Sequence, residues 1–218
     1  MRRSPVHDAL APWRPAWGNV QGGVIAAGMG EGRDEVGAAA TLALCDVSVL
    51  PKLGLKGSES GRWLTDQSII TPVTIYESQT LDAGLIVRTG ADEFFLEDDV
   101  DSSRVAQLTE ALSRTSGDVH HLVREDATFL VAGSRRCEVM AQTCGVNFAE
   151  APSQHLIMTR VAGVSCAVLP ESRNGIAVLR LWVDPSDAIY LWAQLAEIVT
   201  DLAGTVVGAA CFYPSLRG

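Results

Sequence analysis

The clearest alternation of hydrophobic and polar positions lies between Asn174 and Gly204. The dipeptide Asn174-Gly175 favours a tight turn, because both residues tolerate positive φ. The stretch from Ile176 to Val183 is apolar and β-branched, with Arg180 as its only charge. This pattern predicts a turn followed by a mostly buried strand.

The same stretch continues into a predicted amphipathic helix. Asp184 stands where an N-cap belongs, Pro185 follows at the first helical position, and Asp187 adds negative charge to the first turn. Gly204 is expected to end the helix. The apolar positions recur at helical spacing, which predicts one buried face made of Ala188, Leu191, Trp192, Leu195, Ile198, Val199 and Leu202.

The first half of the chain shows shorter patterns of the same kinds. Ala38 to Gly57 predicts two strands about a turn, and the Ser-Glu-Ser run at 58–60 predicts the start of a helix. Leu81 to Glu97 predicts a hairpin. A further helix is expected to begin after Asp101-Ser102 and to end by Gly117.

In the second half, Val119 to Val131 predicts a strand pair or one long strand. A helix is expected after Gly133-Ser134, with Cys137, Met140, Ala141 and Cys144 on its buried face. His155 to Leu169 predicts a strand before a turn at Glu171–Gly175, and Thr205 to Cys211 predicts the last strand.

Helices separated by strand pairs are typical of an α+β fold with mainly antiparallel sheets covered by helices. The order of elements suggests two halves that are alike in outline. We predict an N-terminal arm at 1–36 and an α+β domain at 37–218.

The predicted arm carries Pro5, Pro12 and Pro15 and two tryptophans, Trp13 and Trp17, and its periodicity is weak. Trp provides a large contact surface at a small cost in conformational entropy. Trp13 and Trp17 are therefore candidate contacts with a partner subunit. The alternative, an arm folded back on its own domain, stays open at this point.

Composition narrows the class of protein. The 218 residues are 47% hydrophobic, with a mean hydropathy of +0.17 and a net charge of −9. The values fit a globular protein, and the negative charge argues against a nucleic-acid partner. No apolar run approaches the ~18–20 residues that span a bilayer. The N-terminus has two arginines without an apolar run behind them, so we expect no signal peptide and a cytoplasmic protein.

Few residues of the sequence are candidates for catalysis or metal binding. Five scattered cysteines without a CxxC pair argue against a disulfide frame or a zinc site, and we expect them to be small core residues. A metal site could be drawn from His120-His121 with Asp118 and Glu125. Adjacent residues on a strand point to opposite faces, however, so the two histidines cannot both face one ion. Asp82 is a candidate general base, although an Asp in a loop or cap is the commoner case.

Three stretches carry a family resemblance: ATLALCDVSVLPKLGLKGSESGRWL from Ala40, GLIVRTGADEFFLE from Gly84 and AGSRRCEVMAQTCGVNF from Ala132. They resemble the folate-dependent aminomethyltransferase family, the T-protein of glycine cleavage. A closer likeness is to the gamma subunit of heterotetrameric sarcosine oxidase. It lies in an arm that starts at Ser4-Pro5-Val6, in LCDVS, and above all in RLWVDPSDAIYLW from Arg180 to Trp192.

The chain departs from the transferases where they are catalytic. The stretch TIYESQTLDAG is shortened, and Asp82 is the only acid near the place of their catalytic Asp. Where they hold folate, this chain has RVAGVSCAVLPES at Arg160–Ser172. The resemblance thus implies an aminomethyltransferase folate-binding-domain fold without the C-terminal barrel. No catalytic, cofactor-binding or metal-binding residue is assigned to this chain.

The resemblance implies a non-catalytic assembly subunit of a sarcosine oxidase complex. Such a complex demethylates sarcosine to glycine and passes the one-carbon unit to tetrahydrofolate. FAD, FMN, NAD and tetrahydrofolate would be bound by other subunits: larger flavoprotein alpha and beta subunits, with a small zinc-type delta subunit. Two alternatives stay open. One is a free-standing folate-binding protein with Asp82 pointing into a pocket between the halves, and the other is a subunit of a related N-methyl amino acid dehydrogenase.

Overall fold

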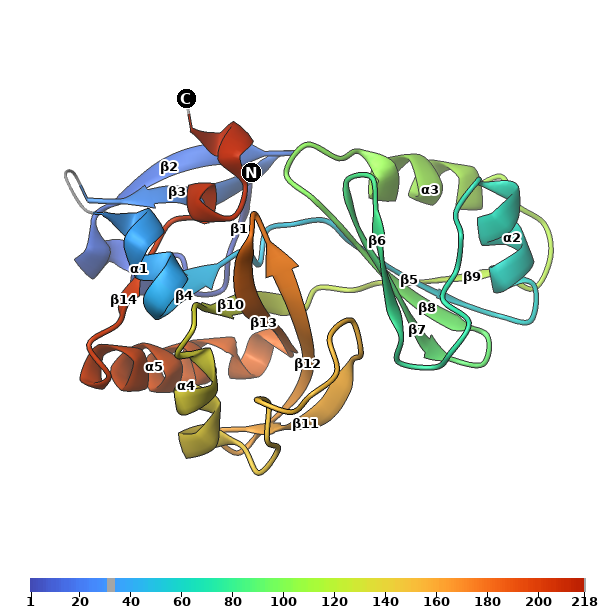
Figure 1. Ribbon diagram of the computed structural model, residues 1–218. Helices are drawn as coiled ribbons and strands as arrows, with labels where there is room; N and C mark the ends of the chain where they lie inside the picture. Colours follow the sequence, from blue (N-terminus) through green and yellow to red (C-terminus); the bar gives the residue numbers. More distant parts are fainter. Residues whose placement is uncertain (31–33, 218) are drawn as a thin grey trace. The chain divides into compact units, whose positions relative to one another are not determined.

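The protein has an α+β fold, as predicted, and its chain forms two compact units (Figure 1). The structure is a computed structural model that describes residues 1–30 and 34–217. Unit 1 consists of Met1–Val49, Asp126–Ser153 and Ile157–Gly218, and unit 2 consists of Leu50–Glu125 and Gln154–Leu156. Most of unit 2, Leu50–Glu125, is therefore an insertion in the sequence of unit 1, and the short piece Gln154–Leu156 is a second one.

Unit 1 is built on a six-stranded sheet in the order β11-β12-β13-β10-β4-β14. Its pairs are antiparallel except for β14 with β4, which is parallel. The strands are β4 (Ala43–Asp46), β10 (Ala127–Ala132), β11 (Ile157–Val161), β12 (Val164–Arg173), β13 (Ile176–Val183) and β14 (Thr205–Val206). The chain leaves the unit after β4 and returns directly before β10, the hydrogen-bonded neighbour of β4.

The strand and helix predicted from Ile176 to Gly204 are present as β13 and α5 (Pro185–Asp201). The Asp184 carboxylate accepts a hydrogen bond from Ser186 N at 2.9 Å and so caps the helix. Most of the predicted face is buried, including Leu191, Trp192 and Leu195. This face packs in one hydrophobic cluster with sheet residues such as Leu44, Phe129 and Leu181.

Two shorter helices and two 3₁₀ turns also belong to unit 1. They are α1 (Glu35–Thr41), α4 (Arg136–Thr143), η2 (Ala209–Cys211) and η3 (Pro214–Leu216). The helices α4 and α5 contact each other on the same side of the sheet (Figure 1). The carboxylate of Glu35 accepts hydrogen bonds from Met29 N at 2.8 Å and Gly208 N at 2.6 Å, so α1 fastens the strand before it to the turn after β14.

The N-terminal segment belongs to unit 1. It forms β1 (Arg2–Arg3), η1 (Asp8–Trp13), β2 (Pro15–Val20) and β3 (Gly23–Met29), with a small sheet in the order β1-β3-β2. Val6 and Leu10 are fully buried in the same cluster as the α5 face. Of the predicted arm at 1–36, residues 31–33 lie outside the described part. The segment folds back on its own unit, and the division at residue 36 stays a prediction.

Unit 2 has a five-stranded antiparallel sheet in the order β6-β7-β8-β5-β9. Its strands are β5 (Lys52–Lys56), β6 (Ser78–Leu81), β7 (Gly84–Gly90), β8 (Glu93–Asp98) and β9 (His120–Leu122). The helices are α2 (Ser60–Asp66) and α3 (Arg104–Leu112). Alternate strand residues such as Leu55, Phe94 and Leu96 form one cluster with Trp63 and Leu108 of the helices. The predicted hairpin and both predicted helices of this region are confirmed.

Four local predictions are wrong. Residues 38–41, predicted as the start of a strand, belong instead to α1, because Asp34 caps Gly37 N and the stretch is rich in Ala. The strand predicted from His155 to Leu169 is broken by a turn in which Ala162 has φ 48°. β12 continues to Arg173, so the turn is only Asn174-Gly175. The last strand ends at Val206, because the backbone of Gly208 packs directly against that of Ala27.

Two helices differ from expectation in detail. In α4 the buried residues are Val139 and Met140, whereas Ala141 is exposed and Cys137 and Cys144 are half-buried. The helix α3 ends at Leu112, five residues before Gly117. None of the described helices is long and apolar enough to cross a membrane.

Candidate functional site

The two predicted contact residues of the N-terminal segment lie in different environments of unit 1. Trp13 ends η1 and is half-buried against the core, with its ring edge-on to that of Trp192 at 6.5 Å and 88°. Trp17 lies on β2 with 42% of its surface exposed, and it stacks on His7 at 4.2 Å. Trp17 therefore presents open aromatic surface, while Trp13 forms one wall of a groove.

This groove, of about 410 Å³, runs between η1 and α5 and is called here the η1–α5 groove. Its lining is mostly apolar, with two acidic residues and one threonine at the C-terminal part of α5. The lining residues are Ala9, Pro12, Trp13, Trp192, Ala193, Ala196, Glu197, Thr200 and Asp201. A concave apolar surface with few polar groups is typical of a binding site. Trp17 does not line this groove.

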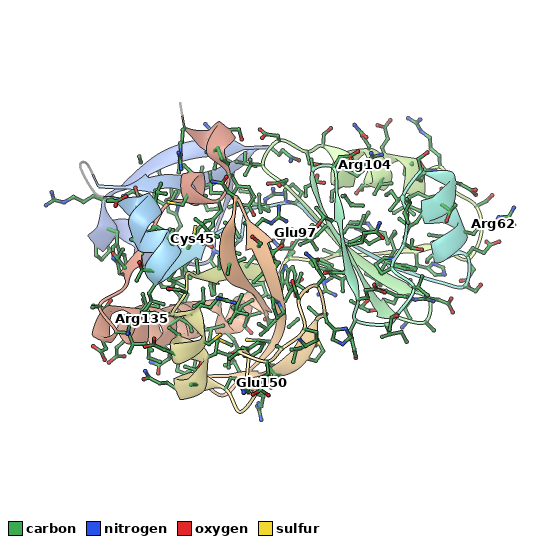
Figure 2. The ribbon with its side chains drawn as sticks, viewed as in Figure 1. Cys45, Arg62, Glu97, Arg104, Arg135 and Glu150 are labelled. Atoms are coloured by element: carbon green, nitrogen blue, oxygen red, sulfur yellow. The ribbon has the colours of Figure 1, made fainter. Side chains whose placement is uncertain are left out.

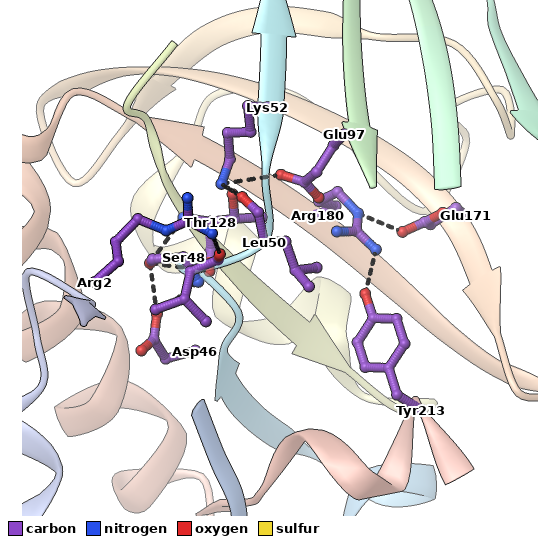
Figure 3. A network of polar contacts seen from close by, with 11 residues as sticks. Arg2, Asp46, Ser48, Leu50, Lys52, Glu97, Thr128, Glu171, Arg180 and Tyr213 are labelled. Carbon is purple, nitrogen blue, oxygen red and sulfur yellow. Dashed lines mark hydrogen bonds and ion pairs between the residues drawn. The ribbon is translucent and has the colours of Figure 1, made fainter. Parts of the chain in front are cut away.

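A buried ionic cluster lies on the opposite face of the unit 1 sheet from α5. Arg180 is fully buried, and its Nε donates to Glu171 Oε1 at 2.6 Å, while its Nη2 donates to the hydroxyl of Tyr213 at 3.1 Å (Figure 3). Arg173 pairs with the other oxygen of Glu171 at 3.2 Å. Buried charges of this kind are held by mutual hydrogen bonds. The cluster therefore joins β12 and β13 to the C-terminal segment.

A second polar cluster follows β4 in unit 1. Asp46 Oδ1 accepts from Ser48 Oγ at 2.5 Å, and Ser48 Oγ in turn accepts from Thr128 N at 3.0 Å (Figure 3). Arg2 donates to the carbonyl of Val49 at 2.6 Å. These contacts fix the chain where it leaves the unit 1 sheet. Asp46 and Ser48 come from the LCDVS motif, which the sequence marked without indicating this structural use.

Unit 2 has its own buried charges. Lys52 Nζ lies 3.3 Å from Glu97 Oε2, and both side chains are almost completely buried (Figures 2 and 3). Asp98 accepts from Ser102 Oγ at 2.7 Å and from Val105 N at 3.0 Å, and so caps the start of α3. The charged groups inside this unit again hold strands and helix starts together.

Asp82 lies at the turn between β6 and β7 and is exposed. It lines a cavity of about 390 Å³ in unit 2 with a mixed polar and apolar lining, together with residues such as Gln79, Ser103 and Arg104. A general base needs a partner within hydrogen-bond reach of the proton it removes. Within the described part of the chain, no hydrogen bond joins Asp82 to a nucleophile.

The two adjacent histidines are exposed on the edge strand β9. His120 Nε2 pairs with Asp118 Oδ1 at 2.9 Å. Asp118 also accepts from Ser58 Oγ and N, and these bonds, followed by that of His120, lower the pKa of its carboxyl to about 2. Among the described residues, no three His, Cys, Asp or Glu side chains gather in a way that would hold a metal ion.

All five cysteines are free. Cys45, Cys166 and Cys211 are buried, as expected for core residues, whereas Cys137 and Cys144 are only half-buried. Burial raises the pKa of Cys166 to about 12 and that of Cys211 to about 11, and it also raises the pKa of Cys45. These three thiols stay protonated near neutral pH and are poor nucleophiles.

The sequence did not indicate the groove, because its walls come from segments about 180 residues apart. The sequence pattern places Trp13 in the N-terminal arm and Trp192 on the buried face of the predicted helix, and no local signal links the two. One signal in the sequence could have pointed to the groove. Glu197 and Asp201 lie four residues apart at the C-terminal part of α5, where a helix favours positive charge.

Comparisons with known proteins give structural matches only. No family model matches the sequence, and no curated protein matches it. The glycine cleavage system aminomethyltransferase T from Bartonella henselae is similar with a TM-score of 0.79 and 16% identity, over 100% of this chain and 62% of that one. This chain therefore spans less than two thirds of the transferase.

A chain of heterotetrameric sarcosine oxidase from Corynebacterium sp. U-96, in complex with pyrrole 2-carboxylate, is similar with a TM-score of 0.66 and 17% identity. The match covers 93% of this chain and 97% of that one. Both neighbours agree with the resemblance stated from the sequence. The protein has the fold that these two chains share, and no barrel is present in its described residues.

Proposed function

We propose that this chain is a non-catalytic assembly subunit of a sarcosine oxidase-type complex in the cytoplasm. The observation that carries the proposal is the nearly complete mutual coverage, 93% and 97%, with a chain of a heterotetrameric sarcosine oxidase. The transferase match covers only 62% of the transferase. The sequence motifs LCDVS and RLWVDPSDAIYLW support the same relationship.

The use of the buried charges also supports a structural role. Glu171 with Arg180 in unit 1, and Lys52 with Glu97 in unit 2, hold elements of the fold together. Asp82, the acid nearest the catalytic place of the transferases, is exposed at a hairpin turn. The reaction centre would accordingly be on other subunits.

In this proposal the complex oxidises sarcosine to glycine and transfers the one-carbon unit to tetrahydrofolate. Larger alpha and beta flavoprotein subunits would bind FAD, FMN, NAD and tetrahydrofolate, and a small zinc-type delta subunit would complete the assembly. This chain, in the place of the gamma subunit, would stabilise the assembled state.

Co-expression tests the proposal. The tagged full chain is expressed with the products of its neighbouring genes, and the purified material is examined for subunits, flavin absorbance and sarcosine oxidation. We expect flavoprotein subunits to co-elute with the chain, and we expect omission of the chain to lower the yield of assembled complex. If the chain elutes alone, and its omission changes neither yield nor activity, the proposal is wrong.

The transferase fold match favours a second candidate, a free-standing folate-binding protein. Titration calorimetry of the isolated chain with tetrahydrofolate separates the two. The assembly role predicts no heat of binding and no thermal shift, whereas the folate-binding role predicts both. Assays of the co-purified complex with other N-methylated amino acids test the remaining alternative, a related dehydrogenase.

A further inference from the structure

Three features of the η1–α5 groove are unusual for a surface that faces only water. Its floor and walls are apolar, an acidic pair stands at one end, and a buried indole N–H in its lining has no acceptor among the residues that the structure describes. The first two features define the chemistry of an occupant.

The apolar part comes from both sides of the groove. Trp13 and Pro12 of η1 face α5, where the small side chains of Ala193 and Ala196 leave room between the elements. Ala196 and Trp192 are buried, whereas Ala193 is exposed. A hollow of this kind accepts an apolar side chain, and aromatic walls with small floor residues are typical of anchor pockets at protein interfaces.

The two acidic residues at the end of the groove are placed unfavourably in two ways. Glu197 and Asp201 are spaced i, i+4, so their like charges repel, and both lie where the helix dipole is negative. Both side chains are exposed, and no hydrogen bond or ion pair is formed by either carboxylate in residues 1–30 and 34–217. Local rules are most often broken at functional positions, where a partner compensates the cost.

The third feature is the indole N–H of Trp192. The residue is 2% exposed, and its Nε1 is buried without a hydrogen-bond partner in the described part of the chain. A buried donor of this kind is normally satisfied. Because this nitrogen has almost no accessible surface, an occupant of the groove contacts the indole ring and not the N–H.

We propose that the η1–α5 groove binds a segment of a flavoprotein subunit that carries an apolar anchor side chain followed by Lys or Arg. The anchor occupies the space between Trp13 and Ala196, and the cation pairs with Glu197 and Asp201. Charge complementarity selects this partner over a second copy of the chain, whose net charge is −9. The inference rests on the proposed assembly role and names its docking surface.

Two variants of the full chain test the groove in the co-expression system. Ala193→Trp fills it from an exposed position, and Glu197→Lys with Asp201→Lys reverses its charge. Each is expected to lower the amount of co-eluting flavoprotein by about tenfold, the change that a single interface anchor typically produces. Ile189→Trp, on an exposed position of α5 outside the groove, and Glu150→Lys, on the surface of unit 1, are the matched controls (Figure 2).

Circular dichroism and urea unfolding of each purified variant separate a docking defect from a folding defect. If the wild-type chain co-elutes with flavoprotein and both groove variants do so as well as the controls, the groove proposal is wrong and the assembly role is unaffected. If the wild-type chain does not co-elute with flavoprotein, the proposed assembly role is wrong, and so is the groove proposal that rests on it.

A photo-crosslinking residue at Thr200 gives a direct second test, because this exposed side chain lines the groove. The expected product is one crosslink to a flavoprotein segment that contains an apolar residue near Lys or Arg. A crosslink to a second copy of the chain, or none to any flavoprotein subunit in the assembled complex, overturns the proposal.

Discussion

At the scale of single residues, Arg180 shows how the fold uses a buried charge. It was the only charged position in an apolar strand, and its side chain is completely buried. Leu169 and Leu130 face it across the two neighbouring strands, and Glu171, two residues along β12, reaches it diagonally. The ion pair thus fixes the register of β12 against β13.

Removing the carboxylate partner is expected to be costly. Glu171→Ala should lower the free energy of unfolding by about 3–5 kcal/mol, because it takes a carboxylate away from a buried guanidinium. Urea unfolding of the full chain measures the change. The double variant Glu171→Leu with Arg180→Met should regain most of the loss, and the exposed Glu150→Ala should have almost no effect. A small effect of Glu171→Ala would contradict this account.

Asp118 gives a pH-dependent prediction at the same scale. Its hydrogen bonds lower the pKa of the carboxyl from 3.8 to about 2 in the folded protein. The folded state therefore binds a proton less readily than the unfolded chain does. The resulting stabilisation is complete above about pH 5 and is lost as the pH falls towards 2.

Urea midpoints of wild type and Asp118→Asn, measured across this range, should converge as the pH decreases. Asp66→Asn, an exposed change on α2, should run parallel to wild type. A constant gap between wild type and Asp118→Asn from pH 5 to pH 2 would contradict the assignment.

At the scale of elements, patterns that are complete within one stretch were predictable. The turn Asn174-Gly175, the strand β13 and the helix α5 each carry their own signals: positive-φ residues, β-branched residues and an Asp-Pro start. The helix α1 was missed because seven residues give little periodicity, and its anchor, Glu35, bonds to Gly208 far along the chain. The same reason hides the groove, since η1 and α5 meet only in the folded unit.

Gly133 shows how tightly two elements join. It links β10 to α4 with φ 99°, and an added Cβ would lie 2.4 Å from the backbone of Thr41. Gly133→Ala should therefore cost about 1–3 kcal/mol of unfolding free energy.

Gly145 is the matched control for this change, because a Cβ there would meet nothing within 4 Å. Gly145→Ala should be neutral or slightly stabilising. Equal urea midpoints for the two variants would show that the approach of Gly133 to Thr41 carries no strain.

At the scale of the whole molecule, the charge of −9 favours association with basic surfaces. If Glu197 and Asp201 pair with a partner cation at the rim of the groove, salt should weaken assembly, because the screening length falls from about 10 Å at 0.1 M to about 3 Å at 1 M. Flavoprotein co-elution should decline over this range for wild type and change much less for the double lysine variant. An identical salt response of both would argue against the rim contact.

The insertion of unit 2 between β4 and β10 also orders events during synthesis. β4 leaves the ribosome roughly 80 residues ahead of β10, its hydrogen-bonded neighbour, which is about 4–16 s at ordinary translation rates. All strands of the unit 2 sheet emerge in that interval and are close in sequence, so they can pair while β4 waits. A nascent chain paused when residue 126 has just left the ribosome should therefore hold a protease-resistant unit 2 behind an unfolded N-terminal stretch, and this stretch is where a chaperone would bind.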